Sequence, residues 1–170
     1  MKNKNTVIFS VVSALCLTTA AIAADTEKLS IDKNNIKVWT LQDPKHPVVS
    51  YRAETTLNTS LERAVGIVLD VENAKAWIPN VASTQVLSQD LSKGEFKLYM
   101  VLDFPFPLKD RDLIIQGSMR KDANGQIQIK NKAIQHGKAQ NPNYIRLQKY
   151  QGDWTFNQLS EGKIKVVTTG

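Results

Sequence analysis

The stretch DFPFPLKDRDLIIQG, residues 103–117, decides how the rest of the chain is interpreted. Phe104 and Phe106 alternate with prolines, which cannot donate to a strand ladder, so this segment must leave any sheet. Four charged residues, 109–112, follow before the next strand-like run. Burying one Phe side chain is worth about 1.5–3 kcal/mol, so two exposed rings would be unfavourable. We therefore expect either a lid over an apolar pocket or a membrane-touching tip; a loop packed on the core is the alternative.

The segment before this loop has one apolar face. In EFKLYMVLDF, residues 95–104, every second side chain is apolar, and residues between them include Glu95 and Lys97. This period of two is typical of a strand with one buried face. Such a face is either the wall of a cavity or part of a plain core. If it lines a cavity, the expected ligand contacts are Phe96, Leu98, Met100 and Leu102.

The order of elements predicts an α+β domain. Residues 36–42 and 48–57 alternate as strands, and a loop with two prolines separates them. Residues 58–80 then change to helical spacing and predict two short helices, which Pro79 ends. Strand-like runs follow at 83–91, 95–104, 111–121, 126–134, 143–150, 153–159 and 163–169. Helices segregated from a long antiparallel meander indicate a curved sheet that needs a filler on its hollow side.

The first 23 residues have the pattern of a secretory signal. A basic head and an apolar run end in Ala21-Ile22-Ala23, which fits the small-x-small cleavage rule. The apolar core is short for a full membrane span of about 20 residues, so a membrane anchor is the weaker alternative. Cleavage would remove Cys16, the only cysteine, and leave a polar connector at 24–34 before a domain at 35–170. We expect a secreted or periplasmic protein without disulfides.

The charge balance argues against nucleic-acid binding. The formal net charge is +6, and Lys2 and Lys4 of the signal account for two of these charges, so 6 − 2 leaves +4. This dispersed excess favours anionic lipid surfaces, and it is too weak to indicate a nucleic-acid partner.

Catalytic and metal-binding patterns are scarce. The two histidines, His46 and His136, lie in separate loops, and no metal site or cofactor is expected. Asp110 and Asp112 alternate with Lys109 and Arg111, so ion pairing between these neighbours explains them better than paired catalytic carboxylates.

The motif FPFPLKDRDLII resembles the Pro-x-Pro and Arg-Asp signature of START lipid-transfer domains. The similarity extends over residues 35–169 and includes the helix pair before Trp77 and the segment YQGDWTF, which contains Trp154. The resemblance implies a helix-grip fold, in which a curved antiparallel sheet wraps a long C-terminal helix around a tunnel for one lipid or sterol. It places residues 104–108, including Phe104, Phe106 and Leu108, at the tunnel mouth. It gives Arg111 a role at the ligand's polar end with Asp103 as partner, Asp112 a structural role, and both tryptophans a place in the core.

The last strand and the long C-terminal helix of that fold have no counterpart in the sequence, so we expect an incomplete chain or a filler from a partner. We expect a binding or transfer protein for an apolar ligand, with transient membrane contact and no covalent chemistry. The alternative is an enzyme on the same scaffold, such as a cyclase or lipid-modifying hydrolase, that uses Asp103, Arg111 or Tyr99.

Overall fold

The computed structural model describes residues 26–42 and 48–170. The predicted signal and its cleavage point, and most of the proline-containing loop with His46, lie outside the described residues. The helical elements are α1 (Leu61–Leu69) and the 3-10 turn η1 (Ala74–Ala76). The strands are β1 (Thr26–Lys33), β2 (Ile36–Gln42), β3 (Ser50–Leu57), β4 (Val81–Asp90), β5 (Glu95–Leu102), β6 (Arg111–Lys121), β7 (Ile127–Ala133), β8 (Ile145–Arg146), β9 (Gln151–Ser160) and β10 (Lys163–Thr169).

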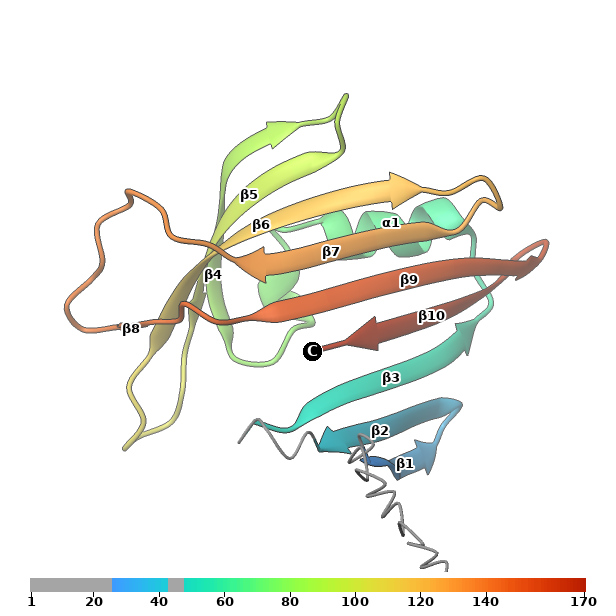
Figure 1. The fold of residues 1–170 in the computed structure, drawn as a ribbon, viewed down its shortest axis with the longest axis horizontal. Coiled ribbons are helices and arrows are strands. Elements are labelled where there is room, and N and C mark those ends of the chain that lie inside the picture. The colour runs from blue at the N-terminus through green and yellow to red at the C-terminus, as the bar shows by residue number, and fades with distance from the viewer. Residues whose placement is uncertain (1–25, 43–47) are drawn as a thin grey trace, which may run out of the picture.

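The strands form one curved sheet in the order β1-β2-β3-β10-β9-β7-β6-β5-β4. Neighbours along this path are all antiparallel, and β8 adds a short parallel pairing to β6. The last strand therefore lies between β3 and β9. The α1–η1 segment carries the chain from β3 across one face to β4 at the far edge, and Figure 1 shows α1 behind the sheet. We call the face that carries α1 the inner face.

Helix α1 begins where the sequence predicts. The Ser60 side chain accepts a hydrogen bond from the Arg63 backbone N–H at 3.2 Å, which satisfies one of the free donors of the first turn. The buried side of α1 packs on the inner face of the sheet. The buried members of this cluster are Leu61, Ala64, Val65, Ile129, Phe156, Ile164 and Val166. The helix therefore fills part of the hollow side, as the strand pattern requires.

The segment expected to be a polar connector is instead strand β1. It pairs with β2 through a turn at Asn34 and Asn35, whose φ angles are 54° and 62°. Two successive positive φ values are typical of the tight hairpin turn that matches strand twist, and asparagine tolerates them. The prediction missed β1 because edge strands carry many charged side chains.

The run at 143–150 was predicted as a full strand, but only β8 pairs within it. The other predicted strands and the two short helices are present, and the α+β helix-grip class is confirmed. Within residues 26–42 and 48–170 there is one α-helix, α1, and β10 is the last element, so these residues hold no counterpart of the long C-terminal helix. None of the helical elements in the described part is long and apolar enough to cross a membrane.

Candidate ligand-binding site

Two neighbouring cavities lie between the α1–η1 segment and the inner face. The first has a volume of about 80 Å³ and the second about 180 Å³. Four apolar residues line both, namely Leu69, Val71, Phe96 and Leu98. The remaining walls of the first are Val68, Ala74, Trp77, Ile78, Met100, Ile115, Ile129, Asn131, Tyr150 and Trp154. The remaining walls of the second are Val86, Gln89, Leu91, Gly94, Glu95 and Met119.

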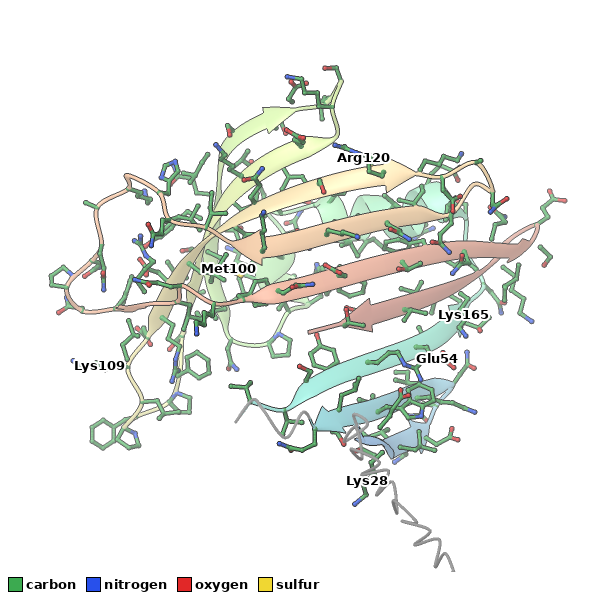
Figure 2. The ribbon with its side chains drawn as sticks, in the orientation of Figure 1. Lys28, Glu54, Met100, Lys109, Arg120 and Lys165 are labelled. Carbon is green, nitrogen blue, oxygen red and sulfur yellow. The ribbon has the colours of Figure 1, made fainter. Side chains whose placement is uncertain are left out.

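Strand β5 supplies one wall of the first cavity. Phe96, Leu98 and Met100 all contact the first cavity, and Leu98 is 6 % exposed. Leu102, on the same face, packs against the small buried cluster around Leu113. The four residues therefore share the inner face because side chains alternate along a strand. Met100 is labelled in Figure 2, where β5 crosses behind β6.

A row of small residues crosses the sheet beneath these cavities. Phe96 pairs with Gly117, Gly117 with Asn131, and Asn131 with Gly152. Gly170 follows Thr169, which pairs with Asp153, so Gly170 lies beside Gly152. We call Gly117, Asn131, Gly152 and Gly170 the inner row.

Aromatic rings from adjacent positions occupy the space that the glycines of the inner row leave. A Cβ built on Gly117 would overlap the Phe96 ring. A Cβ on Gly152 would lie 2.5 Å from the Tyr150 hydroxyl, and one on Gly170 would lie 2.7 Å from the Tyr51 ring. Both distances are shorter than ordinary contacts. The three glycines thus let aromatic rings lie flat against the inner face.

Both tryptophans that the resemblance places in the core line the first cavity, and Trp154 also packs against the buried cluster under α1. Trp77 and Trp154 meet edge to face, with ring centroids 6.0 Å apart, and Trp77 is 38 % exposed. The expectation of a core position is therefore wrong for Trp77. Its place after η1, on the segment that crosses the inner face, brings it to the rim of the cavity. Sequence spacing could not show this, because it does not fix the path of the crossing segment.

The loop 103–110 projects away from both cavities. Phe106 is 96 % exposed and Leu108 is 53 % exposed, so the loop is not packed on the core. Phe104, Phe106, Leu108 and Arg111 contact neither cavity, unlike the predicted residues of β5. Lys109, which is labelled in Figure 2, lies in this loop.

Two contacts hold the base of this loop. The Phe104 backbone N–H donates to Asp110 Oδ1 at 3.1 Å, and the Arg111 guanidinium lies 4.4 Å from the centre of the Phe104 ring. A cation over a ring face in this range is attracted to it. The expected pairing of Arg111 with Asp103 is absent among the described residues. Arg111 therefore stiffens the loop by stacking on it.

Asp112 is in an ion pair, as the charge cluster predicts, but its partner is neither Lys109 nor Arg111. Arg111 and Asp112 project from opposite faces of β6 because side chains alternate. Asp112 is fully buried on the outer face, where Arg146 Nε and Nη2 donate to its two carboxylate oxygens at 2.6 and 2.8 Å. The Tyr99 hydroxyl donates to the same carboxylate at 3.0 Å. Asp112 is structural, as the resemblance implies, but its partner comes from β8.

The electrostatics of this outer cluster favour a fixed, ionised carboxylate. Hydrogen bonds from Arg146 lower the pKa of Asp112 below its usual range despite burial. Burial and the neighbouring Asp112 carboxylate raise the pKa of Tyr99 to about 12. Tyr99, Asp103 and Arg111, the acid–base groups of the enzyme alternative, therefore do not converge on either cavity. Within the described part of the chain no group of three His, Cys, Asp or Glu side chains is arranged to hold a metal ion.

Comparisons with known proteins found relatives of low sequence identity. No model of a known protein family matches the chain. It is 26 % identical over 150 residues to an uncharacterised protein of Pseudomonas aeruginosa, covering 84 % of this chain and 70 % of that protein. It is 24 % identical over 127 residues to human StAR-related lipid transfer protein 7, mitochondrial, covering 73 % of this chain. The match spans 34 % of the human protein's length.

Solved structures show the same architecture. A STAR-related lipid transfer protein of Xanthomonas axonopodis superposes with a TM-score of 0.76 at 21 % identity, over 86 % of this chain and 81 % of that one. Human STARD10 superposes with a TM-score of 0.75 at 18 % identity, over 84 % of this chain and 59 % of that one. The described part of this chain therefore has the START fold, the fold of the StAR-related lipid transfer domains.

Proposed function

We propose that the protein binds one hydrophobic molecule on the inner face of its sheet and carries it without chemical change. The observation that carries this proposal is the pair of cavities with four shared apolar walls, Leu69, Val71, Phe96 and Leu98. Apolar clefts with a few polar groups are typical of small-molecule sites. The START fold supports the proposal, because its solved examples include proteins named for lipid transfer.

The two cavities are small for a lipid-sized ligand. Typical ligand pockets measure about 300–1,000 Å³, which is more than either cavity offers. Leu69, Val71, Phe96 and Leu98 belong to the walls of both cavities. We infer that a lipid-sized ligand displaces these shared side chains and occupies both spaces.

The exposed loop gives the carrier a place to meet a membrane. Phe106 is almost wholly exposed beside the half-exposed Leu108, and Lys109 follows directly. Apolar rings next to a basic side chain suit the boundary between anionic headgroups and acyl chains. We propose that this loop contacts the membrane transiently during loading or release.

We also propose that the protein acts outside the cytoplasm, as the sequence pattern of residues 1–23 suggests. Intact-mass analysis of protein purified from a secreting host is the test. A mature start near Ala24 is expected, and an uncleaved N-terminus would contradict the proposal.

Tryptophan quenching tests the carrier function directly. Trp77 and Trp154 line the first cavity, whereas Trp39 lies on the outer face with the Arg52 guanidinium 3.8 Å from its ring centre. A bromine-labelled alkyl ligand should quench fluorescence with a stoichiometry of one. The signal should fall in Trp77→Phe and Trp154→Phe and persist in Trp39→Phe. Failure of any apolar compound to copurify or load would refute the carrier function.

A further inference from the structure

The first cavity has polar groups at one place only. Of its fourteen lining residues, Asn131 and Tyr150 alone carry hydrogen-bonding oxygen or amide groups at the end of the side chain. The two tryptophans carry only a ring N–H. The cavity is thus an apolar space with one polar end.

These two side chains come from neighbouring positions of the sheet. Asn131 on β7 pairs with Gly152 on β9, and the Tyr150 hydroxyl lies over Gly152. Paired residues of adjacent antiparallel strands have Cα atoms about 4.5–5.5 Å apart. A single functional group of a ligand can therefore reach both the amide and the hydroxyl.

Neither polar group is used by the protein's own hydrogen bonds. Among the described residues no hydrogen bond joins the Asn131 amide or the Tyr150 hydroxyl to another protein group, and Tyr150 is 43 % exposed, so this end of the cavity is partly open to solvent. Burial raises the pKa of Tyr150, and Tyr51 and Asp153 add to the effect, so the hydroxyl stays protonated at neutral pH. It can then both donate and accept, as can the amide.

No cation lines either cavity. The sole charged residue among the described walls is Glu95, at the second cavity, and it is paired with Arg120 at 3.3 Å. A carboxylate or phosphate placed beside Asn131, which is half-buried, would lose part of its hydration without gaining a counter-charge, which is unfavourable. A neutral hydroxyl or ester carbonyl would instead exchange water for two protein partners.

We propose that Asn131 and Tyr150 select ligands with an uncharged hydrogen-bonding head, such as a long-chain alcohol or a neutral ester, over ionised lipids. This inference rests on the proposed function and narrows its ligand class. The head lies at the middle of the inner row, and the apolar tail extends past Phe96 toward the second cavity.

The test compares ligands of equal chain length on the full chain. Diphenylhexatriene, a fluorescent hydrocarbon without polar groups, reports occupancy of the apolar space. Dodecan-1-ol and dodecanoate then compete for it at pH 8, where the carboxylate is ionised because such groups have pKa values of about 4.3. Dodecan-1-ol should displace the probe at a concentration about tenfold or more below that of dodecanoate.

Two variants assign the preference to the polar pair. Tyr150→Phe and Asn131→Leu should each weaken dodecan-1-ol about fivefold, the value of one net hydrogen bond, and leave diphenylhexatriene affinity unchanged. Unchanged probe affinity also shows that each variant is folded. Tyr144→Phe is the matched control, because Tyr144 lines neither cavity, and it should change nothing.

The possible outcomes distinguish failure of this inference from failure of the proposed carrier function. No binding of probe or alcohol by the parent chain would refute the carrier function itself. Probe binding with equal or better competition by dodecanoate would overturn the selection for neutral heads and leave the carrier function standing. Unchanged alcohol affinity in both variants would overturn the role of Asn131 and Tyr150.

Discussion

Arg146 donates a hydrogen bond to each carboxylate oxygen of Asp112, a residue 34 positions earlier in the chain. The side chains are 12 % and 0 % exposed, so the pair is withdrawn from water. It joins β8 to the start of β6 at the point beyond which β7 no longer pairs with β6. The ion pair therefore holds the connection between β7 and β9, residues 134–150, against the outer face of the sheet.

Removing the charge of Asp112 should destabilise the fold. Asp112→Asn leaves Arg146 without its counter-charge, and breaking such a buried pair costs about 3–5 kcal/mol. Glu95→Gln is the control, because its partner Arg120 is exposed and pairs of that kind contribute about 0–1 kcal/mol. Urea denaturation at pH 7 measures both. Equal midpoints for the two variants would contradict the structural role.

The same pair predicts a loss of stability in acid. The pKa of Asp112 is lowered in the folded state, so its contribution is fully present above the unfolded pKa of about 3.9. It is lost as pH falls through the folded value. The parent chain should thus lose more stability than Asp112→Asn between about pH 5 and pH 2. Parallel stability curves over that range would show that the carboxylate is not held ionised.

A side chain at Gly117 should destabilise the folded protein, because it would overlap the Phe96 ring. Gly117→Ala puts a Cβ where that ring lies, and overpacking of this kind costs about 1–3 kcal/mol. Gly66→Ala is the matched control on the exposed side of α1, where no atom beyond the adjacent residues and the helix's own backbone lies within 4 Å of the new Cβ. It should stabilise the protein by about 0.5–1 kcal/mol. A shift of the same sign in both melting curves would argue against the close ring contact.

Phe106 should govern membrane contact. Phe106→Asp replaces an apolar ring worth about 1.5–3 kcal/mol of burial, so partition onto phosphatidylglycerol vesicles should fall by about tenfold or more. Leu159→Asp is the control, because Leu159 is an exposed apolar side chain, 54 % accessible, near the end of β9, and it lines neither cavity. Vesicle cosedimentation compares the two. If Leu159→Asp weakens binding as much as Phe106→Asp, the loop has no special role.

The Ser60 cap should contribute measurably to α1. Ser60→Ala removes the acceptor for the Arg63 backbone N–H and should lower the free energy of unfolding by about 1 kcal/mol. Thr59→Ala, one residue earlier, makes no such cap in the described structure and serves as control. Chemical denaturation that ranks the two variants in the opposite order would contradict the assignment.

The parts of the fold that the sequence predicted are those governed by local pattern. A period of two placed Phe96, Leu98 and Met100 on one face of β5, and helical spacing within residues 58–80 located α1. Both depend only on backbone geometry within a single element. The exposed loop likewise follows from prolines that cannot join a ladder.

The parts that escaped prediction depend on register or on distant partners. Asn131 meets Gly117 and Gly152 only because three strands align at those residues, and a shift of one position would turn Asn131 outward. Arg146 lies in a run that looked like an ordinary strand, so nothing nearby marked it as the partner of Asp112. Residues 112 and 146 are 34 positions apart, and only the folded structure shows that their side chains meet.

The glycines of the inner row have a consequence for the width of ligand that the proposed carrier could hold. Bare backbone at Gly117 and Gly152 leaves the rings of Phe96 and Tyr150 as part of the lining of the first cavity. Rotation about the two side-chain bonds of each residue would change the width of that space without breaking a hydrogen bond between strands. Under the proposed function, a wider ligand therefore requires side-chain rotation and no rearrangement of the sheet.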